Sequence, residues 1–276
     1  MTLRIPTIDD VFHAASIVNQ HTFPIPLIRS YALERELGLP AERHVWLKDY
    51  GWAPSGSFKL MGGLNWMGNN LPRIGDRPVA AHSSGNFASG IAYAGMRFKK
   101  RVIVVMPETA PRVKFEKTKS FGAEIRTYDI TRDHITGDRD RITREIAEGE
   151  GAIQASPYDD PFVIAGNGVG ALDTVADLQR AGRTVSHFFC PVSGGGLMSG
   201  QALSISHGFP DAQIVGVEPA GADDFRQSLA AGQARHDKHS ASTHACRPPS
   251  PWWRCPADRG RPSEHADPRP PSRPPD

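Results

Sequence analysis

The feature that most constrains the fold is an unbroken apolar run, Val102-Ile103-Val104-Val105-Met106, which lies between Arg101 and Pro107. A strand with one face in solvent usually alternates apolar and polar residues. A run without polar residues is typical of a parallel strand that is buried on both faces. Parallel strands are joined by long crossover connections, usually helices. The run therefore predicts a chain in which strands and helices alternate.

Patterns elsewhere in the chain agree with this alternation. Apolar periodicity, prolines and glycines predict helices over residues 9–19, 30–37, 60–67, 88–98, 111–121, 142–148, 171–179, 197–206 and 225–230. Short apolar segments predict strands over residues 44–48, 78–82, 101–107, 124–128, 153–155, 185–190 and 213–218. Residues 23–27 should run extended because of their prolines, and residues 160–170 are rich in turn formers. The predicted fold class is α/β with parallel sheets.

Composition excludes several classes of protein. The chain of 276 residues is 39% hydrophobic, which suits one large or two modest domains. A net charge of +2 gives no sign of a nucleic-acid partner. No apolar run approaches the ~20 residues that span a bilayer, and no secretory signal is recognisable. The cysteines, Cys190, Cys246 and Cys255, form neither a disulfide framework nor a zinc pattern, so we expect a cytoplasmic protein.

The segment Pro54-Ser55-Gly56-Ser57-Phe58-Lys59 lies between a predicted strand and a predicted helix. Lysine is normally a solvated surface charge. In a pocket, however, desolvation lowers the pKa of its amine, which can then form a Schiff base with an aldehyde. The segment alone does not decide between these two interpretations.

Two further segments, Ser83-Ser84-Gly85-Asn86 and Ser193-Gly194-Gly195-Gly196-Leu197, each follow a predicted strand and open a predicted helix. Backbone N–H groups at such a position can bind an anion. The second segment suits a phosphate, although it matches neither a Walker loop nor a dinucleotide fingerprint. Taken alone, the first could equally be a helix N-cap and the second an ordinary tight turn.

Together, in this order and in one α/β chain, these three segments resemble the fold-type II pyridoxal-phosphate enzymes, specifically the serine/threonine dehydratase and serine racemase group. The resemblance runs from about Phe23 to about Ala231. Further motifs that carry it cover residues 24–27, 105–107, 110–111, 122–124, 157–161, 164–166, 191–192 and 215–219. It implies a tryptophan synthase β-like fold with a large domain over residues 1–78 and 156–232 and a small domain over residues 79–155.

The resemblance also implies roles for single residues. Lys59 would bind pyridoxal phosphate as a Schiff base and move the Cα proton of the substrate, and Phe58 would pack against the cofactor ring. Asn86 would bond the phenolic oxygen of the ring. The substrate carboxylate would be held by Ser83, Ser84, Gly85 and Asn86. The phosphate would be held by Ser193, Gly194, Gly195, Gly196 and Leu197. In racemase-like members the residue at the position of Ser84 is an acid–base group, and carboxylate binding alone is the alternative.

Glu218, Ala222 and Asp224 match the place of a magnesium or manganese site in racemase-like members. An acidic turn that precedes a helix is the alternative interpretation. The reaction implied is β-elimination on a hydroxy-amino acid such as serine or threonine, which yields a 2-oxo acid and ammonia. Serine racemase and hydroxyaspartate dehydratase are the alternatives within this group. The resemblance further implies a homodimer that acts on a small amino acid, with no membrane or nucleic-acid partner.

The sequence departs from the family pattern at Met61, Phe87, Ser89 and residues 167–169, and above all from residue 233 onward. Beyond Leu229 there is no Leu, Ile, Val, Phe, Met or Tyr, and ten of the 24 prolines lie from Pro248 onward. Residues 233–276 are therefore expected to be a disordered, non-homologous tail. Translation in a wrong reading frame is favoured over a natural tail. A truncated, non-catalytic remnant is consequently an alternative to an enzyme.

Overall fold

The structure, a computed structural model, describes residues 4–156 and 160–232. The expected tail lies outside these residues. A four-stranded sheet has the order β5-β4-β3-β6, and all of its neighbouring strands are parallel. Its strands are β3 (Val79–His82), β4 (Val102–Pro107), β5 (Glu124–Tyr128) and β6 (Ile153–Gln154). Every residue of β4 is buried, which confirms the prediction made from the apolar run.

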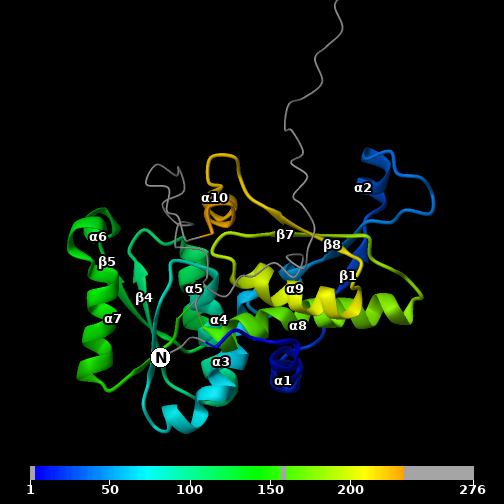
Figure 1. Ribbon diagram of the computed structural model, residues 1–276. Coiled ribbons are helices and arrows are strands. Elements are labelled where there is room, and N and C mark those ends of the chain that lie inside the picture. Colours follow the sequence, from blue (N-terminus) through cyan, green and yellow to red (C-terminus); the bar gives the residue numbers. More distant parts are fainter. Residues whose placement is uncertain (1–3, 157–159, 233–276) are drawn as a thin grey trace, which may run out of the picture.

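Four helices belong to the same stretch of chain: α4 (Asn86–Phe98), α5 (Arg112–Ser120), α6 (Ile130–Thr136) and α7 (Asp138–Gly149). Helices α6 and α7 lie at one end of the molecule (Figure 1). Sequence patterns did not predict α6. It is short and mostly polar, and it is defined by its ends: Asp129 accepts a hydrogen bond from the N–H of Thr131 at 2.9 Å, and Gly137 ends the helix with φ 59°.

The remaining strands form two pairs. Strands β7 (His187–Pro191) and β8 (Gln213–Val217) are parallel, as predicted. Strands β1 (Leu27–Arg29) and β2 (Trp46–Lys48) are antiparallel, so the prediction of parallel sheets is wrong for this pair. The other helices are α1 (Ile8–Val18), α2 (Tyr31–Glu36), α3 (Lys59–Ile74), α8 (Pro161–Arg180), α9 (Gly196–Gly208) and α10 (Asp224–Ala231), with a short 3₁₀ helix, η1 (Tyr50–Trp52).

Helix α8 corrects the expectation of turns over residues 160–170. It is one helix of 20 residues, with Pro161 in its first turn and the Asp160 carboxylate bonded to the N–H of Phe162 at 2.8 Å. Its glycines serve packing rather than turns. A Cβ on Gly166 would lie 2.5 Å from the carbonyl oxygen of Met61, and one on Gly168 would lie 2.6 Å from that of Gly200. Backbones of neighbouring helices therefore touch at these points.

Replacing Gly200 by alanine should destabilise the protein by about 1–3 kcal/mol, because the new methyl group overpacks a backbone contact. Its Cβ would lie 2.2 Å from the carbonyl oxygen of Ile164, so α8 and α9 would have to separate. Urea unfolding of the two proteins measures the loss. Gly149→Ala is the matched control, since a Cβ there meets nothing within 4 Å and improves helix propensity. Equal stability of the Gly200→Ala and wild-type proteins would contradict the close packing.

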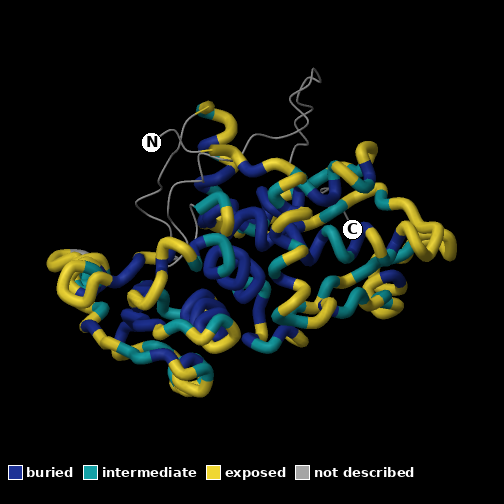
Figure 2. The backbone as a smooth tube through the Cα atoms, turned by 90° about the horizontal axis from the view of Figure 1, so that it is seen from below, coloured by how far each residue is buried: buried dark blue, intermediate teal, exposed yellow. Residues whose placement is uncertain are grey.

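The most buried part of the molecule is its central group of helices (Figure 2). Ten residues of α3 are buried, including the side chains of Leu60, Leu64 and Trp66. One hydrophobic cluster joins α1, α3, α4 and α8 with strands β3 and β4. The division into a large domain and a small domain over residues 79–155 stays a prediction. Among the described residues, no helix has the length and apolar character that crossing a membrane requires.

Candidate active site at three helix N-termini

Lys59 is the first residue of α3, which follows β2 and η1. Its Nζ lies 5.1 Å from the centroid of the Phe58 ring, and that ring meets Tyr50 edge to face at 6.1 Å. Burial lowers the pKa of the Lys59 amine to about 8. Near neutral pH a much larger fraction of this amine is therefore unprotonated than for an ordinary lysine. An unprotonated amine is the form that attacks aldehydes and accepts protons.

Helix α4 brings the Ser83–Asn86 loop to Lys59. A Cβ on Gly90 would lie 2.9 Å from the carbonyl oxygen of Lys59, and one on Gly63 would lie 3.1 Å from that of Gly90. These contacts join the first turns of α3 to the second turn of α4, so the N-termini of the two helices lie close together. In the loop, Ser83 Oγ accepts the N–H of Gly85 at 3.2 Å, and Ser84 is partly buried.

Helix α8 brings the second glycine loop to the same place through Asn167. The Nδ2 of Asn167 donates to the carbonyl oxygen of Gly196 at 3.4 Å. Its Oδ1 lies 2.9 Å from the point that a Cβ on Gly62 would occupy. One buried side chain thus spans from the first turn of α3 to the first residue of α9. The three segments singled out in the sequence therefore converge around the N-terminus of α3.

The second loop has the backbone of an anion site. Gly195 has φ 80° and Ser193 has φ 50°. Within the described residues, only Lys99 and Ser193 are non-glycine residues with positive φ. Strain of this kind is concentrated at functional sites. The loop ends at the N-terminus of α9, whose first N–H groups have no acceptor within the helix and which carries partial positive charge.

Three buried polar atoms around this place have no hydrogen-bond partner among the described residues: Ser57 Oγ, Asn167 Oδ1 and Ser199 Oγ. A buried polar group without a partner costs about 1–3 kcal/mol, so such groups call for a ligand or water. Two of the three are hydroxyl donors, and they lie next to the starts of α3 and α9. With the amine of Lys59, the residues present fit pyridoxal phosphate. Sequence patterns gave these three atoms no role, since no local pattern reveals an unpaired buried group.

Glu218, Ala222 and Asp224 form a second group, around the N-terminus of α10. Glu218 Oε2 accepts the backbone N–H of Arg226 at 3.0 Å. The pKa of Glu218 is raised by burial and by the neighbouring carboxylates of Asp224 and Asp223, against these backbone hydrogen bonds. In the part of the chain that the structure describes, no three His, Cys, Asp or Glu side chains gather as metal ligands.

Comparison with known proteins identifies the family. Residues 18–254 match the family described as pyridoxal-phosphate dependent enzyme. The chain is 33% identical to the L-threo-3-hydroxyaspartate ammonia-lyase of Saccharomyces cerevisiae, over 84% of this chain and 68% of that protein. It is 32% identical to the serine racemase of Schizosaccharomyces pombe, over 85% of this chain and 69% of that protein.

Comparison with solved structures gives relatives of the same kind. The threonine deaminase of T.th. superposes with a TM-score of 0.75 at 33% identity, over 84% of this chain and 71% of that one. Maize serine racemase also superposes with a TM-score of 0.75, at 27% identity, over 83% of this chain and 66% of that one. The chain thus spans about two thirds of the length of these relatives. It belongs to the family of pyridoxal-phosphate-dependent enzymes and has the fold of the fold-type II members.

Proposed function

We propose that the protein catalyses β-elimination on a hydroxy-amino acid, releasing a 2-oxo acid and ammonia. One observation carries this proposal: an amine with a pKa near 8 lies where the N-termini of α3, α4 and α9 meet. Relatives named threonine dehydratase and L-threo-3-hydroxyaspartate ammonia-lyase support the reaction class. Serine and threonine are the simplest members of this substrate class.

Pyridoxal phosphate, when bound, supplies the electron sink that makes the Cα proton of an amino acid acidic. The amine of Lys59 would hold the cofactor, and it is the group that would accept that proton. Hydroxyls of Ser57 and Ser199 and the N–H groups at the start of α9 would hold the phosphate. Phe58 would pack against the ring. The low pKa of Lys59 suits both tasks, because each needs the neutral amine.

The Ser83–Asn86 loop holds the substrate carboxylate with its hydroxyls and the N–H groups at the start of α4. This fixes the Cα–H bond toward Lys59. Lys59 accepts the Cα proton and returns it to the departing β-hydroxyl, which leaves as water. An enamine remains and tautomerises to an imine. Addition of water to the resulting imine gives the 2-oxo acid and ammonia, so all atoms balance.

Racemisation is the second candidate, because Ser84 is partly buried and lies in the loop that would hold the carboxylate. A proton returned by Ser84 from the face opposite Lys59 would invert Cα. Serine racemases from Schizosaccharomyces pombe and maize are among the relatives. Chiral analysis of L-serine during turnover separates the two reactions, since D-serine forms only by racemisation.

Lys59→Ala should abolish covalent cofactor binding, whereas the wild-type chain with added pyridoxal phosphate should show a visible absorption band that borohydride removes. Only Lys59 is expected to supply the reactive amine, because burial keeps it partly neutral. Lys119→Ala, an exposed lysine on α5, is the matched control and should keep the band. A band of equal strength in the Lys59→Ala protein, or no band in the wild type, would refute the proposal.

We further propose a cytoplasmic homodimer, and a magnesium or manganese ion held by Glu218, Asp224 and the carbonyl of Ala222. Burial and, to a smaller extent, the neighbouring carboxylates raise the pKa of Glu218. The carboxylates support the ion, because a divalent cation would relieve their repulsion. Light scattering tests the dimer. Thermal unfolding with added Mg²⁺, Mn²⁺ or chelator tests the site, and an unchanged midpoint in all three would refute it.

A further inference from the structure

Helix α5 carries two lysines, Lys114 and Lys117, one turn apart and partly buried beside the candidate active site. Lys114 Nζ donates to Asn86 Oδ1 at 3.0 Å. Lys117 Nζ donates to the carbonyl oxygen of Ser55 at 3.4 Å. One ammonium group therefore reaches the loop that binds the carboxylate, and the other reaches the segment that leads to Lys59.

Glycines make room for both ammonium groups. A Cβ on Gly85 would lie 3.2 Å from Lys114 Nζ, and a Cβ on Gly56 would lie 2.9 Å from Lys117 Nζ. Both ammonium groups thus lie against glycine backbone, one in the Ser83–Asn86 loop and one in the segment that leads to Lys59. Side chains at positions i and i+3 of a helix start ~5–6 Å apart, so the two charges can act on one small ligand.

Neither Lys114 nor Lys117 forms an ion pair within the part of the chain that the structure describes. By contrast, Arg101, just before β4, lies against the carboxylates of Glu124 and Glu150. No carboxylate of residues 4–156 or 160–232 comes within 4.0 Å of either Lys114 Nζ or Lys117 Nζ. A partly buried cation without a counter-charge is costly and is a natural partner for an anion. Two such cations match a ligand with two anionic groups.

We propose that Lys114 and Lys117 are specificity residues that bind the two carboxylates of a dicarboxylic hydroxy-amino acid, of the 3-hydroxyaspartate class. Lys114 supports the α-carboxylate on the Ser83–Asn86 loop, and Lys117 binds the carboxylate of the side chain. Serine and threonine would leave Lys117 without a partner. The inference rests on the proposed function, because it assigns the substrate class of the same site.

Calorimetric titration of the chain, saturated with pyridoxal phosphate, tests the inference without turnover. Succinate and butyrate are the probes, since both have four carbons and differ in one carboxylate. Wild type should bind succinate at least tenfold more tightly than butyrate. Lys117→Met should lose this preference, and Lys117→Arg, which keeps the charge, should retain most of it. Lys119→Met, on the exposed side of the same helix, should behave as wild type.

Two results would overturn the inference: equal binding of the two probes by wild type, or an unchanged preference in Lys117→Met. A loss of both affinities to the same extent would show that Lys117 only ties α5 to the Ser55–Gly56 segment, which also overturns it. The Lys59-dependent absorption band is measured first, because the titrations use the cofactor-loaded chain. A band without a succinate preference leaves the proposed function standing and overturns the inference alone, whereas a wild type without the band refutes the proposed function and the inference with it. With an active enzyme, Lys117→Met should lower kcat/KM for 3-hydroxyaspartate at least tenfold more than for serine.

Discussion

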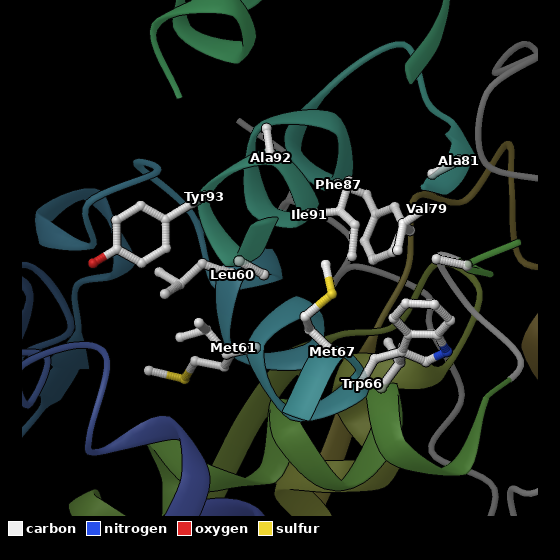
Figure 3. Close-up of a cluster of buried hydrophobic side chains, with 14 of the residues drawn as sticks. Leu60, Met61, Trp66, Met67, Val79, Ala81, Phe87, Ile91, Ala92 and Tyr93 are labelled. Atoms are coloured by element: carbon white, nitrogen blue, oxygen red, sulfur yellow. The ribbon is translucent and has the colours of Figure 1, made fainter. Parts of the chain in front are cut away.

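Trp66→Ala is expected to lower the free energy of unfolding by about 3–5 kcal/mol, the range for truncating a large buried aromatic side chain. Trp66 is only 1% exposed and lies in α3 beside Met67, in the cluster that also holds Phe87 and Ile91 (Figure 3). Its indole N–H also donates to Asp160 Oδ2 at 3.1 Å. The substitution therefore removes a hydrogen bond and leaves a cavity between α3 and the start of α8.

Two variants separate these effects. Trp52→Ala removes the same side chain at a position that is 63% exposed, and it should cost less than about 0.5 kcal/mol. Trp66→Phe keeps most of the packing but loses the bond to Asp160, so an intermediate loss is expected. Chemical denaturation followed by circular dichroism measures all three proteins. A loss at Trp66 no greater than that at Trp52 would contradict the packing of the core.

Elements with a strong local pattern could be predicted from the sequence. Strand β4 has an unbroken apolar run, and α5 begins next to Pro111 and is followed by Gly122, whose φ is 84°. Helix α8 could not be predicted in its first half, because Gly166, Gly168 and Gly170 favour turns locally. Contacts that are distant in sequence stabilise their helical conformation: Gly166 packs against α3, Gly168 against α9 and Gly170 against Tyr50. Tertiary packing overrides local propensity there.

Part of the candidate site could likewise be predicted from the sequence, and part of it could not. Lys59 and the two glycine loops are continuous segments, so the sequence displays them. Lys114, Lys117 and Asn167 join these segments from other helices, and nothing in their local sequence indicates which loop they reach. The local sequence does not show which side chains are buried, so the low pKa of Lys59 could be found only from the structure. The same holds for the hydroxyl of Ser57, which has no hydrogen-bond partner among the described residues.

The stability of the cofactor-free protein should depend on pH through Lys59. Its pKa falls from 10.5 in the unfolded chain to about 8 in the folded one, because burial disfavours the ammonium form. Between these values the unfolded chain binds more protons than the folded chain, so stability rises with pH. Below pH 8 both states are protonated and the full cost of burial remains. The gain from pH 8 to pH 10.5 should approach about 3 kcal/mol.

Lys59→Met isolates this contribution, because it keeps a long side chain without the charge. The difference in unfolding free energy between wild type and Lys59→Met, measured in urea from pH 7 to pH 11, should favour the variant at low pH and vanish near pH 10.5. Tyr50 and Cys190, whose pKa values burial raises, titrate in both proteins, and their effects cancel in the difference. Lys119→Met, which removes an exposed ammonium, should stay within about 0.5 kcal/mol of wild type. A difference that is flat across this range would mean that the Lys59 amine is solvated, and the amine would then lose the chemistry assigned to it here.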